Sequence, residues 1–163
     1  MAECLNILTI NNPKEEAFLR KKSIEVSKDE IGSKEFQSFL DDLLFTAQNI
    51  VTEEGYKSAG LAAVQVGKNL RVFCILKKDS NDFEIMINPQ LDILQSREII
   101  QLEGCLSIPR REGNVSRHNK VRVTYLNRYG KKIKKKFSGI ESREIQHEYD
   151  HIEGILFIDK ITD

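Results

Sequence analysis

A chain of 163 residues is long enough for one domain whose core needs no disulfide or structural metal. Its 25 basic and 25 acidic residues give a formal charge of zero, so no overall field draws it to DNA or to an anionic membrane, and we expect neither partner. Three widely spaced cysteines argue against a disulfide framework and for a reducing compartment. The N-terminal segment lacks a signal or transit pattern, and no apolar run approaches the roughly 20 residues that cross a bilayer. We therefore expect a cytoplasmic protein.

The first strong pattern predicts an amphipathic helix in the N-terminal half. Apolar residues recur at three-and-four spacing from Phe36 to Val51, as on a helix with one buried stripe. Ser33 is a suitable N-cap and Gly55 a suitable C-terminal stop, which places the helix at about 34–54. Short β-like segments follow, at residues 70–76, 85–88, 93–94 and 97–102.

A β-hairpin is predicted next. Its arms are residues 121–126 and 132–137, and the connecting residues 127–130 include an Asn and a Gly that suit a turn. In the second arm, three lysines alternate with residues that share the opposite face, as on a half-exposed antiparallel strand. We expect this lysine face to be solvated, with docking on an anionic partner as the less favoured alternative.

The last pattern predicts a second helix at residues 139–153. Ser138 and Glu141 form a capping-box signature, and Gly154 lies where a helix often ends. No repeat, low-complexity segment or linker interrupts the chain. The sequence therefore predicts an α+β fold in one domain, with antiparallel or mixed sheets packed around this second helix.

The second helix carries a candidate metal site. His147 and His151 are four residues apart, so both side chains lie on one helix face and can hold one ion. In such an H-E-x-x-H helix the glutamate, here Glu148, moves the proton of a metal-activated water. The alternative is that the two histidines bind no metal and have separate structural roles, because a five-residue match is only moderately specific.

A catalytic metal site typically has three protein ligands and one open position, so a third ligand is needed. A metzincin site would have a histidine six residues after His151, but Phe157 occupies that position. Glu153, Asp159 and Asp163 are possible in principle, although Glu153 should point to another side of the helix. Because only 12 residues follow His151, we expect the third ligand to lie upstream.

Cys105 is the preferred upstream ligand. It lies in the segment 103–109 after a β-like run, a thiolate binds divalent transition metals strongly, and the preceding Gly104 permits a close backbone approach. His118 is the rival, but its polar surroundings predict an exposed loop. A further segment, residues 60–67, combines small residues with Gln65, whose amide can donate to a developing oxyanion.

Together these three segments resemble peptide deformylase. That family has G-x-G-x-A-A-x-Q, E-G-C-L-S and Q-H-E-x-D-H segments in this order, and the chain has residues 58–65, 103–107 and 146–151 in their places. The second and third segments are complete, and their joint occurrence is highly specific. The first departs at Ser58, where the family has glycine, which should alter the backbone near the substrate cleft more than the chemistry.

The resemblance implies one catalytic domain over residues 1–163 that removes the formyl group from the N-terminal formylmethionine of nascent polypeptides. Hydroxide generated at the metal attacks the formyl carbon, and the ribosome is a transient partner. One divalent ion per chain is implied, ferrous iron in the cell, with zinc, nickel or cobalt able to replace it. The implied roles are metal ligation by Cys105, His147 and His151, catalysis by Glu148, Gln65 and the Leu106 N–H, and substrate binding by Ala59, Gly60 and Gly104; Glu103 and Arg117 would support the metal loop.

Two other classes of function fit part of the sequence. A zinc endopeptidase shares H-E-x-x-H, but Phe157 and the intact cysteine segment disfavour it. A non-catalytic binding protein with a structural metal would not need Glu148, and its site would usually be closed by a fourth protein ligand.

Overall fold

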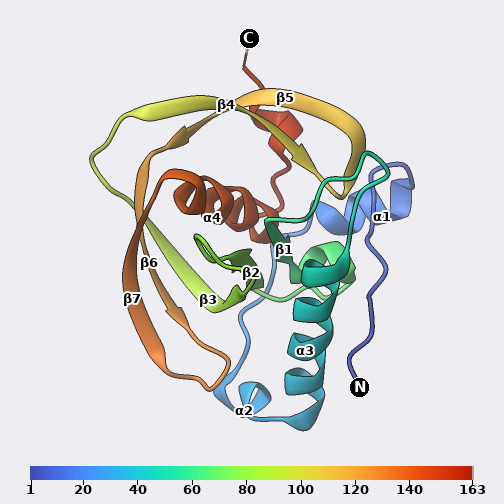
Figure 1. Ribbon diagram of the computed structural model, residues 1–163. Helices are drawn as coiled ribbons and strands as arrows, with labels where there is room; N and C mark the ends of the chain where they lie inside the picture. Colours follow the sequence, from blue (N-terminus) through green and yellow to red (C-terminus); the bar gives the residue numbers. More distant parts are fainter. Residues whose placement is uncertain (163) are drawn as a thin grey trace.

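The computed structural model describes residues 1–162 and shows two antiparallel sheets (Figure 1). The larger sheet has the strand order β1-β2-β3-β6-β7, and the smaller is the pair β4-β5. The strands are β1 (Gly60–Ala62), β2 (Val72–Leu76), β3 (Phe83–Ile93), β4 (Glu98–Cys105), β5 (Ile108–His118), β6 (Lys120–Leu126) and β7 (Lys132–Ser138). All pairings within both sheets are antiparallel.

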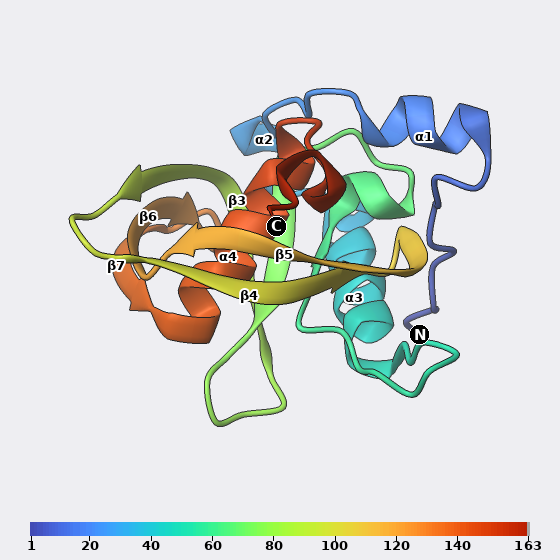
Figure 2. The ribbon, with the colours of Figure 1, turned by 90° about the horizontal axis from the view of Figure 1, so that it is seen from above.

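Helix α4 (Gly139–Ile152) lies at the centre of the molecule, and β4 and β5 cross over it (Figures 1 and 2). The other helices are α1 (Pro13–Leu19), α2 (Lys28–Ile31) and α3 (Lys34–Asn49), and single 3₁₀ turns cover Ala63–Val66 and Phe157–Lys160. Within residues 1–162, no helix has the length and apolar character to cross a membrane. The predicted α+β fold, with sheets around the H-E-x-x-H helix and an amphipathic helix in the N-terminal half, is confirmed.

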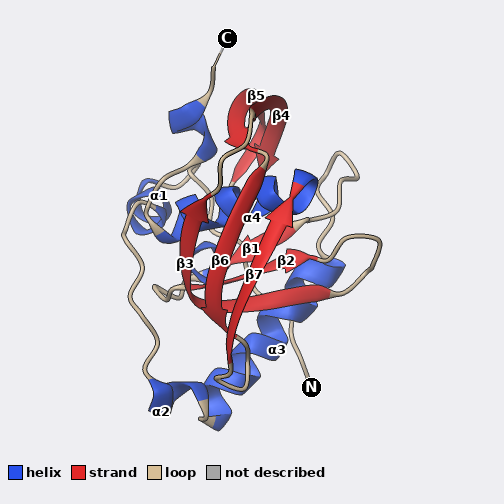
Figure 3. Ribbon diagram, turned by 90° about the vertical axis from the view of Figure 1, so that its left-hand side faces the viewer, coloured by secondary structure: helices blue, strands red, loops and turns tan. Residues whose placement is uncertain are grey.

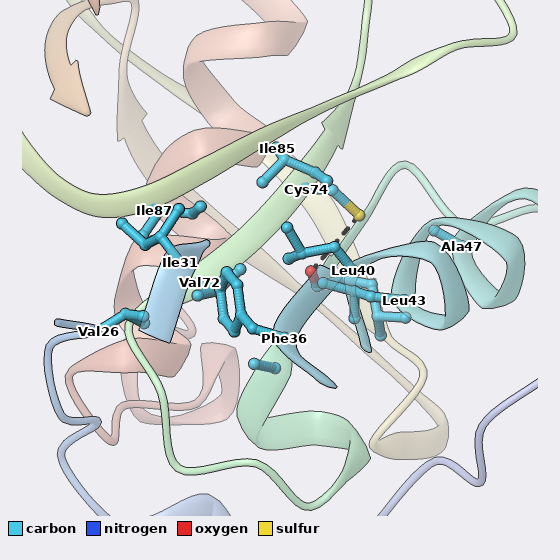
Figure 4. Close-up of a cluster of buried hydrophobic side chains, with 12 residues drawn as sticks. Val26, Ile31, Phe36, Leu40, Leu43, Ala47, Val72, Cys74, Ile85 and Ile87 are labelled. Carbon is cyan, nitrogen blue, oxygen red and sulfur yellow. Dashed lines mark hydrogen bonds between the residues drawn. The ribbon is translucent and has the colours of Figure 1, made fainter. Parts of the chain in front are cut away.

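Two buried clusters pack against opposite faces of the larger sheet. Along β2, Val72 and Cys74 point toward α3, whereas Phe73 and Ile75 point toward α4, as the two-residue period of a strand requires. Figure 4 shows the first cluster, in which the stripe of α3 meets the sheet and the Cys74 thiol lies 3.7 Å from the carbonyl oxygen of Leu61. The sheet is therefore buried on both faces at this strand.

The predicted helix at 34–54 is right in its start and wrong in its end. The Ser33 side chain accepts a hydrogen bond from the Phe36 N–H, as expected of an N-cap. The helix ends at Asn49 because Ile50 turns to an extended conformation and Val51 then forms a bridge with Lys57. The short helices α1 and α2 were not predicted, since four to seven residues carry too little periodicity.

The predicted hairpin is confirmed as β6 and β7, and the predicted second helix as α4. Two details differ. The Ser138 side chain makes no cap hydrogen bond, so the capping box is wrong. Residues 116–118, predicted as part of an exposed loop, belong to β5, where they pair with β4. The sequence did not indicate this strand because most of its residues are polar and its buried apolar positions do not alternate regularly.

Candidate metal centre

Three side chains, two from α4 and one from β4, converge on one face of α4. His147 and His151 lie on consecutive turns of the helix, with ring centroids 5.1 Å apart, and both are buried. Cys105 ends β4, where the strand turns into β5. Its sulfur and one nitrogen of each ring all lie within 4.8 Å of one another. The tight β4-β5 turn thus places the cysteine over the helix face that carries the histidines.

The orientation of each ligand atom fits a metal ion. His147 Nδ1 is 2.9 Å from Glu103 Oε1, which leaves its Nε2 free to bind. His151 Nε2 is 3.3 Å from Cys105 Sγ, so this nitrogen faces the thiol. Burial lowers the pKa of His151, which favours the neutral imidazole that a metal requires. A thiolate with two imidazoles suits zinc, iron, cobalt or nickel.

Glu103 connects the metal ligands to a buried charge network. Although its burial opposes ionisation, hydrogen bonds from Arg117 and His147 hold the pKa of Glu103 well below its usual range. Arg117 donates to both Glu103 oxygens at 2.9 Å and to Asp150 Oδ2 at 2.6 Å. Arg143 adds a further hydrogen bond to Glu103 Oε2 at 2.5 Å. A carboxylate held by two guanidinium groups fixes the ring of His147.

Glu148 follows the candidate ligand His147 on α4 and is 2 % exposed. Its Oε1 is a buried oxygen that has no hydrogen-bond partner in the part of the chain that the structure describes. Burial raises the pKa of Glu148 to about 8, an effect that the charge of His147 opposes. Gly60 on β1 makes room for this carboxylate, because a Cβ at that position would lie 2.8 Å from Glu148 Oε2.

Gln65 reaches the site from the 3₁₀ turn that follows β1. Its Oε1 accepts a hydrogen bond from the Ala62 N–H at 2.9 Å, so its amide nitrogen must point the other way. That nitrogen donates to Ser107 Oγ at 3.1 Å and is 3.6 Å from Cys105 Sγ. The amide donor is therefore aimed at the group of candidate ligands before any substrate binds.

The remaining predicted site residues differ in how far they are exposed to solvent. Leu106 packs against the cluster that contains α3, and Gly104 is exposed on β4. The Ala59 carbonyl oxygen already accepts a hydrogen bond from the Leu76 N–H at 2.9 Å. Ser58 donates from its hydroxyl to the Gly60 carbonyl oxygen at 2.7 Å, which ties the departure from the family pattern to the backbone next to Glu148.

The rival third ligands lie elsewhere. His118 ends β5, half-buried, with its ring 3.9 Å from Glu98. Glu153 pairs with Arg71, Asp159 pairs with Arg20, and Asp163 lies outside the described residues.

The sequence analysis missed two residues that contact the site, Ser107 and Arg143. Ser107 is the last residue of E-G-C-L-S and accepts the hydrogen bond that orients Gln65. Arg143 lies one helical turn before His147, a spacing that could have indicated a shared face. Its contacts with β4 and β5 come from tertiary packing and leave no pattern in the local sequence.

Comparison with known proteins identifies the family. The family model described as polypeptide deformylase matches residues 4–163. A peptide deformylase from Karelsulcia muelleri is 39% identical over 152 residues, which cover 89% of this chain and 74% of that protein. The peptide deformylase from Caulobacter vibrioides is 37% identical over 161 residues, covering 96% of this chain and 87% of that protein.

Solved structures agree over nearly the whole length. The crystal structure of the Thermotoga maritima peptide deformylase has a TM-score of 0.84 and 27% sequence identity, and the match covers 99% of both chains. The Acinetobacter baumannii class I type b peptide deformylase, solved with Met-Ala-Ser bound, has a TM-score of 0.85 at 28% identity, covering 99% of this chain and 100% of that one. The chain belongs to the polypeptide deformylase family, a family of metal-dependent hydrolases.

Proposed function

We propose that this chain removes the formyl group from the N-terminal formylmethionine of nascent polypeptides and releases formate. The observation that carries this proposal is the convergence of Cys105, His147 and His151 within 4.8 Å, beside a buried Glu148, in a chain of this family. Three ligands leave a coordination position open, as catalytic rather than structural metal sites do. Residues 1–163 would act as one catalytic domain.

One divalent ion per chain would be held by Cys105 Sγ, His147 Nε2 and His151 Nε2. Bound there, the ion would supply Lewis acidity toward water and the formyl oxygen. We propose ferrous iron as the ion used in the cell, with zinc, nickel or cobalt as substitutes on the same ligands. Glu103 would keep the His147 ring in the orientation that presents Nε2.

Glu148 would carry the proton through the reaction. It takes a proton from the attacking water and returns it to the leaving amine, which frees the N-terminus of the peptide. A pKa raised by burial to about 8 suits a carboxylate that accepts and releases a proton near neutral pH. The lone oxygen Oε1 is available for this role because no described side chain already binds it.

The Gln65 amide and the backbone N–H of Leu106 would donate to the oxyanion. Gln65 needs no rearrangement, because the Ala62 N–H already fixes its orientation. The loss of one such donor typically costs about 3 kcal/mol of transition-state stabilisation.

The peptide would bind in an extended conformation, with backbone hydrogen bonds to Ala59, Gly60 and Gly104. The relative from Acinetobacter baumannii was solved with Met-Ala-Ser, which supports a methionine-first peptide as the ligand class here. Because the substrate is a nascent chain, we also propose a transient encounter with the ribosome.

The experiment is formate release from formyl-Met-Ala-Ser by anaerobically purified protein loaded with iron or nickel. Cys105→Ala should lose both metal and activity, whereas Glu148→Gln should keep the metal and lose activity by about 100-fold or more. Matched controls are Cys4→Ala, at an exposed cysteine, and Glu141→Gln, at the start of the same helix.

Three outcomes would contradict the proposal. An inactive metal-loaded protein would point to a binding protein of this family. Cleavage of unformylated internal peptide bonds would point to an endopeptidase. Full activity of Glu148→Gln would show that Glu148 does not carry the proton.

A further inference from the structure

Five basic side chains share the outer face of β6 and β7, which we call the basic face. Register pairs Arg122 with Lys136, Thr124 with Lys134 and Leu126 with Lys132, so these positions stand on one side of the sheet. Figure 3 shows this side of β3, β6 and β7 turned outward, with α4 behind the sheet. The basic face consists of Lys120, Arg122, Lys132, Lys134 and Lys136.

The core fixes the direction of these side chains. Val121, Val123 and Phe137 alternate with them and are buried in the cluster that contains α4. A slip of one residue would bury the cations, so the outward direction is strongly specified. Within residues 1–162, none of the five side chains has an ion pair or a side-chain hydrogen bond.

Protection of a sheet edge does not account for this face. β7 is an edge strand, where lysines discourage pairing with other chains, but β6 is an interior strand. On it, Arg122 lies directly opposite Lys136, and like charges in that position destabilise a sheet. On its other side Arg122 faces Asp92 of β3, the one carboxylate among the outward positions that pair with β6. One carboxylate cannot neutralise five cations, so the positive charge remains concentrated.

We propose that the basic face docks on the phosphate backbone of double-helical RNA. Lys132, Lys134 and Lys136 follow one strand at intervals of roughly 6.8 Å, a regular row that complements a regular row of phosphates. The outer face of β6 and β7 is two strands wide, and the wide, shallow minor groove of A-form RNA is flanked by phosphates that such a surface can contact. Five of the 25 basic residues gather on this face in a protein whose net charge is zero, so attraction to a polyanion would favour this orientation.

The location of the basic face leaves the metal centre free. The two candidate histidines are on α4, which lies behind the sheet when the basic face is turned to the viewer (Figure 3). Tyr129, at the tip of the hairpin and 83 % exposed, extends the same edge and could contact a ribose or base. RNA bound in this way would not cover the helix face that carries His147 and His151.

The test measures binding of the metal-loaded protein to a fluorescein-labelled RNA duplex of about 16 base pairs by anisotropy, across a series of salt concentrations. The variant carries Lys132→Glu, Lys134→Glu and Lys136→Glu. The slope of log affinity against log salt is negative, and each lost phosphate contact should reduce its magnitude by about 0.9. The slope of the variant should therefore be shallower than that of the wild type by about 2 to 3. Affinity at low salt should fall at least about tenfold.

The matched control carries Lys14→Glu, Lys34→Glu and Lys77→Glu, the same charge change at exposed lysines outside β6 and β7. It should keep the wild-type slope. An equal loss in this control, an unchanged slope in the β7 variant, or equally tight binding of the same sequence as DNA would overturn the proposal. Tighter binding of polyglutamate than of RNA would also overturn it, in favour of an acidic protein partner.

Two further measurements separate docking from folding and from catalysis. Lys136→Glu alone should raise Tm, because it places a carboxylate opposite Arg122, so loss of RNA binding cannot be assigned to unfolding. Formate release from formyl-Met-Ala-Ser should be unchanged in the β7 variant. An inactive wild-type enzyme with intact RNA binding would reject the proposed function alone, and the converse result would reject the docking surface alone.

Discussion

Gly60 leaves room for the buried carboxylate of Glu148, and a methyl group there tests that fit. The added Cβ of Gly60→Ala would meet Glu148 Oε2 at 2.8 Å, so the carboxylate must move. We expect kcat for formate release to fall by about 100-fold, because a displaced proton carrier loses most of its contribution. Metal content should be unchanged.

The control for this substitution is Gly32→Ala. The nearest atom to a Cβ at that position is the Asp29 carbonyl oxygen at 3.9 Å, an ordinary contact, and activity should be that of the wild type. If kcat of Gly60→Ala equalled that of the wild type, the position of the Glu148 carboxylate would not matter for the reaction, which would contradict its role as the proton carrier.

Arg143 is predicted to position the metal ligands through Glu103. Arg143→Leu would remove one of the two guanidinium groups that hold the buried Glu103 carboxylate, together with the donor to the Val115 carbonyl oxygen. The loss of one partner of a buried ion pair typically costs about 3 to 5 kcal/mol of folding free energy. Metal affinity should fall about 10- to 100-fold, because Glu103 orients His147. Urea denaturation and metal titration measure the two effects.

Arg110→Leu is the comparison for Arg143→Leu. Arg110 makes its ion pair with Glu53 at the surface, with 76 % of its side chain exposed, so neither stability nor metal affinity should change measurably. Equal metal affinity in wild type and Arg143→Leu would restrict Arg143 to a purely structural role.

At the scale of elements, sequence patterns predicted those parts whose burial is one-sided and regular. The stripe of α3 and the β6-β7 hairpin show a clear period of 3.6 or 2. Helix α4 was predicted instead from Ser138, Glu141 and Gly154, because it is buried on most sides and has no single apolar stripe. β5 has no such apolar alternation, and β1 has only three residues, so neither gave a signal. Their positions depend on partners that are distant in the chain, which a local pattern does not contain.

The stripe of α3 should contribute strongly to stability. Leu40 is fully buried against the larger sheet, and Leu40→Ala should lower the free energy of unfolding by about 2 to 5 kcal/mol. Phe45 on the same helix is exposed, and Phe45→Ala should have a small effect by comparison. Urea denaturation of both variants measures the difference; equal effects would mean that α3 does not pack as described.

At the scale of the whole molecule, the candidate metal centre joins segments that are far apart in the chain. Sequence spacing paired His147 with His151 on one helix face, and the need for an upstream third ligand, together with thiolate chemistry, indicated Cys105. The network of Arg117, Arg143 and Glu103 could not be predicted from spacing, because it arises where β4, β5 and α4 pack together. The site is therefore a property of the assembled fold.

Metal removal should consequently lower the stability of the entire domain. An ion that binds the folded chain alone stabilises it by about 2.7 kcal/mol at a free concentration of 100 times Kd. Chelation should lower Tm in wild type, and re-addition should restore it. Cys105→Ala should have a Tm that is insensitive to chelator; an equal chelator effect in this variant would mean that the ion stabilises the fold elsewhere.

Strand β2 pairs with β1 and β3 and is buried on both faces by the clusters that contain α3 and α4, so its amide hydrogens can exchange with solvent only when this part of the core opens. The two halves of the core should then open together, as one cooperative unit. Slower deuterium uptake caused by an ion on the α4 side would therefore also be detected at the amides of Val72 and Cys74, although their side chains pack against α3 and none of the candidate metal ligands lies on α3.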